Sequence, residues 1–223
     1  MTIWIACVAA GWGIAYLLGS IPTGYLAGKL LKGIDLREHG SRSTGATNVL
    51  RMLGPWPAFM VLVVDLLKGA AAILFAHWFY PWLGTLPSGL TPTAFELQAW
   101  GPWAVCFAGL AALLGHSRSI WLGFTGGKSA ATGLGVLLAL SWPVGLGAAA
   151  VFGIVLAIFR IVSLSSMLAA ATAIVLIFCL EHPLPYRLLV LAGGFYVIAR
   201  HRANIRRLLT GQEPRLGQGS LNS

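Results

Sequence analysis

The stretch SAATGLGVLLALSWPVGLGAAAVFGIVLAIF, residues 129–159, contains no charged side chain. A single helix of this length would be about 46 Å long at 1.5 Å per residue, whereas the hydrocarbon core of a bilayer is only about 30 Å thick. Pro143 lies near the middle, and a proline interrupts a helix because it has no backbone N–H to donate. The stretch therefore predicts two short membrane helices, 129–141 and 143–159.

The charges on either side of this stretch also favour two crossings. Lys128 precedes it and Arg160 follows it. An even number of crossings places both residues on the same side of the membrane. The positive-inside rule prefers cationic residues on the cytoplasmic side, so we expect both to face the cytoplasm.

The rest of the chain has a similar composition. Of its 223 residues, 57% are hydrophobic and only 9% are charged, whereas a soluble domain usually carries about 25% charged residues. Open sheet edges are not tolerated in hydrocarbon, so the spans must be helices. We predict an all-α, polytopic membrane protein with seven transmembrane helices, at residues 2–28, 56–80, 98–115, 129–141, 143–159, 161–180 and 184–203.

The positive charge orients these helices. Most of the fifteen Lys and Arg residues lie in 29–55, in 116–128, at 160 and after 203, whereas the loop at 80–100 has none. With the N-terminus outside and the C-terminus cytoplasmic, all the basic segments face the cytoplasm. This rule explains much of the net charge of +9, so we do not expect nucleic acid as a partner.

The chain is predicted to form one domain, because it contains no internal repeat. We expect a seven-helix membrane domain over residues 1–211 and a short flexible tail over 212–223. The N-terminus lacks the positive region of a signal peptide, so we interpret it as a retained first helix. The three cysteines are scattered through apolar runs and predict neither a disulfide nor a metal site.

Polar residues gather in three clusters, of which the first covers residues 19–51 and has HGSRSTGATN, residues 39–48, as its core. Its glycines would let backbone N–H groups approach an anion closely. Arg42 and Arg51 would supply forked donors that suit phosphate oxygens. Taken alone, the cluster is equally compatible with an ordinary hydrophilic loop.

The second cluster is GHSRSIWLGFTGGKSAATGLG, residues 115–135. Gly126, Gly127 and Lys128 stand just before a predicted helix, where the helix N-terminus and a lysine favour an anion. A P-loop would require glycine at the position of Leu122 and a preceding strand, so we do not predict nucleotide hydrolysis. Glycine-rich helix packing remains the alternative interpretation.

The third cluster is ARHRANIRRLLTGQE, residues 199–213. Its arginines are typical of a topology anchor, but His201 and Asn204 are three residues apart and would share one helix face. They are candidates for a ligand site or for a purely structural role. Within the second span, Asp65 and Lys68 are also three apart; mutual neutralisation accounts for them, although ionisable residues in a span often mark function.

Several kinds of site are not predicted. Six carboxylates without metal-ligand spacing favour neither a metal nor a cofactor. The chain lacks the G-x-S-x-G nucleophile motif. It also lacks the H-x-x-x-x-D motif of the large class of acyltransferases that use histidine as a base.

Together the motifs resemble the bacterial membrane family of acyl-phosphate:glycerol-3-phosphate acyltransferases. The resemblance covers nearly the whole chain, and the matching stretches are LLGSIPTGYL, DLREHGSRSTGATNVLR, VVDLLKG, LGHSRSIWLGFTGGKSAATGLG and RHRANIRRLLTGQE. Two positions depart from the family pattern: Ser129 replaces the last glycine of G-G-K-G, and Ser117-Arg118-Ser119 replaces a segment with an aromatic residue and proline. The resemblance implies seven spans, an outside N-terminus and an active site at the cytoplasmic face of the bacterial inner membrane.

The resemblance also implies a reaction. A fatty acyl group passes from acyl phosphate to the 1-hydroxyl of sn-glycerol 3-phosphate, giving 1-acyl-glycerol 3-phosphate (lysophosphatidate) and phosphate, the first committed acylation in phospholipid synthesis. Acyl-CoA is not the donor in this family. The expected partners are glycerol 3-phosphate, acyl phosphate, membrane lipid and a soluble enzyme that supplies acyl phosphate, with no cofactor.

On the matching positions we expect two sets of site residues. Those expected to be catalytic are Ser41, Arg51, Lys128, His201 and Asn204. Those expected to bind substrate are Arg42, Thr47, Asn48, Gly126, Gly127 and Ser129. An acyl phosphate is already activated, so the enzyme mainly has to position reactants and stabilise charge. A substrate phosphate is the expected base, with His201 as the alternative.

One rival comes from another class of protein. A transporter or binding protein for an organic phosphate could also use helix N-termini and basic residues, but transporters usually place the site near the bilayer midplane and often carry inverted repeats. The clusters here are predicted at one face, and no repeat is present. A membrane scaffold without chemistry would leave the three clusters unexplained.

Overall fold

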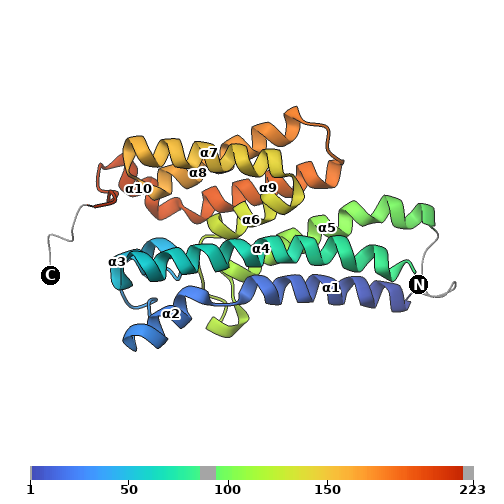
Figure 1. Ribbon diagram of the computed structural model, residues 1–223, viewed down its shortest axis with the longest axis horizontal. Helices are drawn as coiled ribbons and strands as arrows, with labels where there is room; N and C mark the ends of the chain where they lie inside the picture. The colour runs from blue at the N-terminus through green and yellow to red at the C-terminus, as the bar shows by residue number, and fades with distance from the viewer. Residues whose placement is uncertain (1, 86–93, 218–223) are drawn as a thin grey trace.

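The computed structural model describes residues 2–85 and 94–217, and within these ranges the chain forms ten α-helices and one turn of 3-10 helix, η1. The long helices run along a common axis, and the chain passes back and forth between the two ends of the molecule (Figure 1). Residues 86–93 of the expected outer loop and 218–223 of the expected tail lie outside the described residues.

The first predicted span, 2–28, is broken. Helix α1 (Thr2–Ser20) ends before Pro22, and helix α2 (Thr23–Lys32) begins after it. The prediction of one continuous helix was wrong because proline has no N–H to donate and disfavours helical geometry in the residue before it.

The break leaves two backbone carbonyl groups without helical partners, and other elements supply donors. The Ser20 carbonyl accepts the Ser119 hydroxyl at 2.6 Å, and the Ile21 carbonyl accepts the Lys68 ammonium at 2.9 Å. Irregular backbone in a membrane protein is tolerated where protein groups satisfy it in this way.

Three helices follow the break. Helix α3 (Ala46–Leu53) is short, and α4 (Pro55–Leu83) and α5 (Ala94–Ser117) are long. The segment 33–45 between α2 and α3 is called the first loop below. The segment 118–129 after α5, which contains η1 (Ile120–Leu122), is called the second loop.

The stretch 129–159 divides into two helices, as predicted. Helix α6 (Ala130–Leu140) and helix α7 (Trp142–Phe159) are separated by Ser141, whose backbone is extended. Pro143 therefore lies in the first turn of α7, where its missing N–H costs no helical hydrogen bond. Figure 1 shows α6 and α7 running in opposite directions.

The remaining helices are α8 (Val162–Cys179), α9 (Leu184–Arg200) and α10 (Arg202–Leu209). The last span was predicted to reach 203, but α9 stops at Arg200 and His201 joins it to α10. His201 thus ends one helix and begins the next, which fixes its position relative to both.

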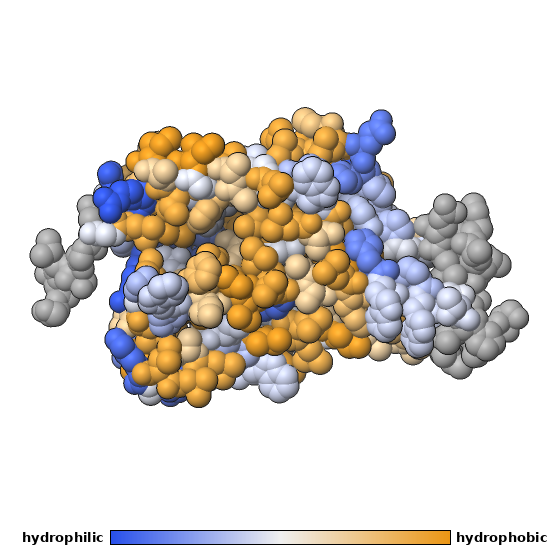
Figure 2. Space-filling model, in the orientation of Figure 1, coloured by the Kyte–Doolittle hydropathy of each residue, from blue (hydrophilic) through white to orange (hydrophobic). Residues whose placement is uncertain are grey.

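Five helical segments in the described part are long and apolar enough to cross a membrane: Trp4–Lys32, Pro55–Leu83, Ala99–Ser117, Trp142–Phe159 and Val162–Cys179. The first contains the break between α1 and α2. Helices α6 and α9, with 11 and 17 residues, are shorter. Figure 2 shows apolar residues over the middle of one face of the molecule and hydrophilic residues towards its ends.

Helix α4 packs against α6 at the centre of the molecule. A side chain at Gly69 of α4 would collide with the backbone of Thr132, and one at Gly135 of α6 would collide with the backbone of Leu66. The two glycines therefore allow the helix backbones to approach, as small residues do in membrane helix pairs. This contact fixes where α6 begins, and hence where the second loop ends.

Candidate active site

The first loop is folded around the side chain of Asn48, which has no exposed surface. Its amide nitrogen donates to the carbonyl oxygens of Leu36, His39 and Ser43 at 3.1, 3.0 and 2.9 Å. Its side-chain oxygen accepts the N–H of Ser41 at 2.9 Å. The hydrogen bonds of Asn48 among the described residues go to the loop backbone and hold the loop in shape. Its predicted contact with substrate stays a prediction.

The shaped loop and α3 present three polar side chains to one cavity. Ser41, Thr47 and Arg51 all line it, and the last two are four residues apart on α3, so they share a face. Arg42 is exposed and is not among the described residues that line the cavity. Its backbone φ of 56° is left-handed, a conformation that non-glycine residues adopt infrequently.

Gly126 and Gly127 of the second loop allow close packing against the end of α5. A side chain at Gly126 would collide with the backbone of His116, and one at Gly127 would collide with the His116 imidazole. The Gly127 N–H donates to the His116 carbonyl at 3.2 Å, and the Gly127 carbonyl accepts from Arg200 at 3.0 Å. Both glycines were predicted to bind substrate, but the Gly127 N–H is already used and neither residue is among the described residues that line the cavity.

Ser129 anchors the end of the second loop. It has no exposed surface, and its hydroxyl donates to the Leu113 carbonyl of α5 at 2.7 Å. Its backbone φ of 62° is left-handed. Glycine adopts this conformation without strain, which gives a physical reason why the resembled family commonly has glycine here.

His201 and Asn204 line the same cavity and are buried, with 4% and 5% of their surfaces exposed. The Nδ1 atom of His201 lies 2.8 Å from the Val197 carbonyl oxygen. Because a carbonyl only accepts, Nδ1 carries the proton in this bond. The Nε2 atom of the neutral ring is therefore an acceptor.

Glu213, which follows α10, was not predicted as a site residue. Its carboxylate accepts hydrogen bonds from Asn204 at 2.6 Å, Ser163 at 2.7 Å and Arg207 at 2.7 Å. Burial alone would raise the pKa of Glu213, but these three donors outweigh it and lower the pKa. The residue lies beyond the boundary predicted at 211, is buried and lines the cavity.

The charge composition of the C-terminal stretch offered one sequence clue to the role of Glu213. It is the only carboxylate among residues 182–223, in a stretch crowded with arginines. A lone carboxylate among cations is a candidate for a buried hydrogen-bonded partner. Ser163, on a different helix, carried no sequence signal at all.

Lys128 joins the second loop to this group. Its ammonium donates to the side-chain oxygen of Asn204 at 2.6 Å. Burial lowers the pKa of Lys128 to about 8; Glu213 opposes this effect, and Arg207, Arg51 and Arg200 reinforce it. Two of these cations, Lys128 and Arg51, line the cavity, which is an arrangement that favours anionic ligands.

The pair Asp65 and Lys68 is buried, with 1% and 5% of the residue surfaces exposed. Lys68 lies 2.8 Å from the Asp65 carboxylate, which also accepts the Thr23 hydroxyl at 2.5 Å. His116 lies 3.6 Å from the same oxygen. Asp65 and Lys68 therefore neutralise each other, which was one of the two interpretations of the sequence. Through Thr23 and Ile21 they also hold the break between α1 and α2 in place.

The cavity has a volume of about 1090 Å³ and contains two different environments. Its polar end contains Ser41, Arg51, Lys128, His201 and Asn204, together with Thr47, Asn48 and Ser129. Its apolar arm continues between α6, α7, α8 and α9, lined by small and aliphatic side chains, among them Gly133, Ala148, Ala170, Ala173, Gly194 and Val197. Eight of the eleven predicted site residues therefore meet at one place, although they come from three separate parts of the sequence.

Comparisons with known proteins agree with this arrangement. The sequence matches the glycerol-3-phosphate acyltransferase family over residues 9–211. It is 72% identical over 218 residues to glycerol-3-phosphate acyltransferase 2 of Rhizobium johnstonii, covering 98% of this chain and 99% of that protein. It is 55% identical over 218 residues to the glycerol-3-phosphate acyltransferase of Trichormus variabilis, covering 98% and 96% of the two chains.

The fold is similar to that of a solved membrane protein. A crystal structure of PlsY (YgiH), an integral membrane glycerol 3-phosphate acyltransferase in its glycerol 3-phosphate form, matches with a TM-score of 0.79 and 37% identity, over 94% of this chain and 96% of that chain. The lysophosphatidic acid form of that protein matches with a TM-score of 0.76 and 36% identity, over 94% and 95% of the chains.

Proposed function

The chain belongs to the glycerol-3-phosphate acyltransferase family, and from this membership we propose that it transfers a fatty acyl group from an acyl phosphate to the 1-hydroxyl of sn-glycerol 3-phosphate. The products are 1-acyl-glycerol 3-phosphate and inorganic phosphate. The observation that carries this proposal is a single cavity in which a cationic polar end opens into an apolar arm.

The two parts of the cavity suit the two parts of the donor. An acyl phosphate has a long apolar chain and a phosphate head, so the chain would lie in the arm between α6 and α9 while the head lies at the polar end. Glycerol 3-phosphate is small and anionic, and it needs only the polar end. Burying the chain among apolar side chains is favourable at roughly 25 cal/mol per Å², which gives the arm a role in holding the donor.

The reaction requires one bond to form and one to break. The 1-hydroxyl oxygen attacks the acyl carbonyl carbon and forms the ester bond. The bond between that carbon and the phosphate oxygen breaks, and phosphate leaves with the electron pair. The hydroxyl proton passes to a substrate phosphate, which is both near and basic enough; the Nε2 acceptor of His201 is the alternative base.

The residues at the polar end supply charge and orientation. Lys128 and Arg51 would bind the two phosphates, and Ser41 and Thr47 would add hydroxyl donors. Asn204, held between Lys128 and Glu213, would orient glycerol 3-phosphate or the reacting carbonyl. Direct transfer of this kind needs no nucleophilic side chain, because phosphate is a good leaving group and the acyl phosphate is already reactive.

A second group of residues would support the site without contacting substrate. Asn48 would hold the first loop, and the Gly126–Gly127 pair would seat the second loop on α5. Ser129 would anchor the start of α6. Arg42, which is exposed outside the cavity, would attract the anionic substrates from solution.

The proposed function also leads to an inference about membrane topology and cellular compartment. We infer seven crossings, with α6 and α9 as the short ones, an outside N-terminus and a cytoplasmic C-terminus in the bacterial inner membrane. The alternating directions of the helices in Figure 1 and the basic residues of the two loops and of α10 support this orientation. A cytoplasmic site would meet acyl phosphate from a soluble supplying enzyme and glycerol 3-phosphate from the cell interior.

One assay tests the function. Purified protein in detergent is incubated with palmitoyl phosphate and labelled glycerol 3-phosphate, and lysophosphatidate is measured by chromatography. A parallel reaction contains palmitoyl-CoA as the donor. We expect product only with the acyl phosphate; product from the thioester, or none from either donor in folded protein, would contradict the proposal.

A further inference from the structure

The phosphate-binding residues of the proposed reaction come from two segments, the first loop with the adjoining helix α3 and the second loop. The first loop is held by Asn48 and leads into Thr47 and Arg51 of α3. The second loop ends at Lys128 and is held against α1 and α5. The two phosphate-bearing substrates can be aligned for acyl transfer only if the distance between the loops is fixed.

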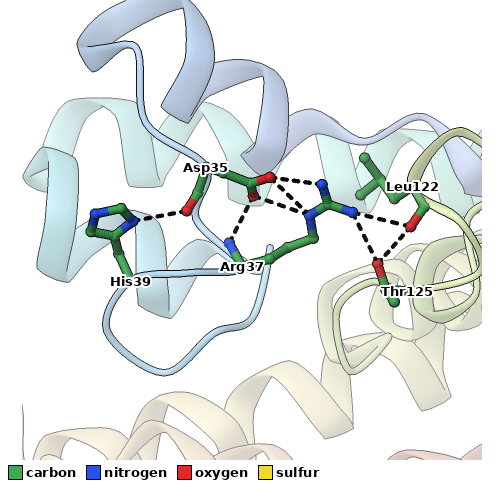
Figure 3. A network of polar contacts seen from close by, with 5 residues as sticks. All are labelled: Asp35, Arg37, His39, Leu122 and Thr125. Carbon is green, nitrogen blue, oxygen red and sulfur yellow. Dashed lines mark hydrogen bonds and ion pairs between the residues drawn. The ribbon is translucent and has the colours of Figure 1, made fainter.

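Arg37 of the first loop spans the gap between the two loops (Figure 3). One Nη atom of its guanidinium donates to the Leu122 carbonyl of the second loop at 3.1 Å and lies 3.5 Å from the Thr125 hydroxyl. Among the described residues, the hydrogen bonds found between the first loop and the second loop all come from this one side chain.

The other edge of the same guanidinium is held inside the first loop. Its Nε lies 3.0 and 3.2 Å from the two carboxylate oxygens of Asp35, and its second Nη lies 2.7 Å from one of them. Its plane lies near the ring of Tyr25, with Cζ 5.2 Å from the ring centroid. The planar fork can satisfy both loops at once, which a lysine ammonium cannot do with the same geometry.

The contact with Arg37 favours the charged form of Asp35. The side-chain hydrogen bond from Arg37 lowers the pKa of Asp35 to about 2, against the opposing effect of burial. The backbone of Asp35 is held in turn by His39, whose Nδ1 lies 2.9 Å from the Asp35 carbonyl oxygen. Arg37 therefore has a rigid anchor on the first loop.

The Leu122 carbonyl, which accepts from Arg37 on the second loop, is connected to the turn that leads to Lys128. The Leu122 carbonyl accepts the Thr125 hydroxyl at 2.7 Å in addition to Arg37. Thr125 pairs with Ser119 across the loop, and it is followed by the glycine pair and Lys128. A bond to Leu122 thus restrains the whole turn that carries the ammonium.

We propose that Arg37 is a positioning residue, which sets the spacing between the phosphate-binding side chains of the first loop and α3 and Lys128 of the second loop. Neither Arg37 nor Asp35 is among the described residues that line the cavity, so the effect acts through the loops. The proposal rests on the proposed acyl transfer. Activity of the wild-type protein tests that function, and the ratio of variant to wild type tests Arg37.

The test compares Arg37→Ala, Arg37→Lys and the control Arg118→Ala in full-length protein. Arg118 is an exposed arginine that donates at 3.4 Å to the Phe124 carbonyl within the second loop, so it binds a loop carbonyl without joining the loops. For each variant, kcat, both KM values and the melting temperature are measured. Arg37→Ala is also assayed with millimolar guanidinium, and with potassium at equal ionic strength.

We expect Arg37→Ala to lower kcat by about 10- to 100-fold, the effect of a misplaced reactant, with a smaller change in KM and a melting temperature close to that of Arg118→Ala. Guanidinium should restore part of kcat, potassium should not, and Arg37→Lys should stay low. Unchanged kcat in Arg37→Ala would overturn the proposal. A loss of kcat that follows a large fall in melting temperature without guanidinium rescue would overturn it as well, since it would assign a general structural role.

Discussion

The ammonium of Lys128 donates a 2.6 Å hydrogen bond to the side-chain oxygen of Asn204, which lies 76 residues further along the chain. The same Asn204 donates at 2.6 Å to Glu213. This line of three residues joins the second loop, α10 and the segment after α10. The polar end of the cavity is therefore assembled from residues that are far apart in the sequence.

Removing either cation of the proposed phosphate clamp should nearly abolish acyl transfer. For Lys128→Ala and Arg51→Ala we expect kcat/KM for glycerol 3-phosphate to fall by about 100- to 1,000-fold, the range found when a charge-stabilising donor is removed. Steady-state kinetics on purified protein measure this. Arg202→Ala, an exposed residue of α10, is the charge-matched control, and near-normal turnover in both clamp variants would exclude the model.

Acyl transfer should weaken above about pH 8. Burial lowers the pKa of Lys128 to about 8, so the ammonium is present below this pH and is lost as the pH rises through it. A bound phosphate would favour the charged form, so we expect the change in kcat/KM, which reports the free enzyme, more than in kcat.

The variant Lys128→Arg separates this titration from others, because a guanidinium stays protonated. Its kcat/KM, whatever its absolute value, should not fall near pH 8. If the wild type and Lys128→Arg lose activity over the same pH range, Lys128 is not the titrating group.

His201→Gln should distinguish a binding role from that of a base. With a substrate phosphate as the base, the variant should raise KM for glycerol 3-phosphate while kcat falls by less than about tenfold, because only binding is weakened. Initial rates at saturating acyl phosphate measure both constants. A fall in kcat of several powers of ten at constant KM would instead make His201 the base.

Glu213→Gln should weaken both activity and stability. The NH2 group of a glutamine would face either Arg207 or the pair Asn204 and Ser163, which already donate to the two carboxylate oxygens. Hydrogen bonds to charged groups contribute about 1.5–3 kcal/mol. We expect kcat to fall at least tenfold and the melting temperature to decrease. Gln212→Ala, at the exposed neighbour, should leave both unchanged, and wild-type behaviour of Glu213→Gln would contradict the assigned role.

Filling the apolar arm should shorten the preferred acyl chain. Ala170 lines the arm on α8, whereas the next residue, Ala171, is exposed on the outside of that helix. Ala170→Phe should shift the ratio of kcat/KM values towards shorter acyl phosphates, since the ring would occupy space otherwise open to the chain. Ala171→Phe should keep the wild-type ratio; equal chain-length profiles for all three proteins would place the chain elsewhere.

Much of the fold followed from the sequence, because membrane helices obey local rules. Low charge and long apolar runs predicted an all-helical membrane protein. The division of 129–159 into two helices followed from bilayer thickness, from Pro143 and from the basic residues on either side. The break at Pro22 was also visible in principle, since it depends on one residue. What hides such a break is that the apolar pattern continues across it.

The polar clusters also marked the site in advance, since glycine, hydroxyl and amide residues beside cations are unusual in a membrane protein. The sequence could not say which of them face substrate. In the structure the Asn48 amide and the Gly127 N–H bind backbone carbonyls, whereas their predicted contacts with substrate stay predictions. That outcome depends on how each loop closes, which neighbouring residues alone do not specify.

By itself, then, the sequence determined which segments are apolar and where the charged residues gather, and its motifs implied the chemistry through the family resemblance. Apolar character and charge belong to each residue regardless of its neighbours. Only the tertiary structure decided that Lys128 meets Asn204 and Glu213, that Arg37 reaches Leu122, and that the cavity continues between α6 and α9. Such contacts join segments far apart in the chain, and they arise from helix packing, which sets distances that spacing along a sequence does not encode.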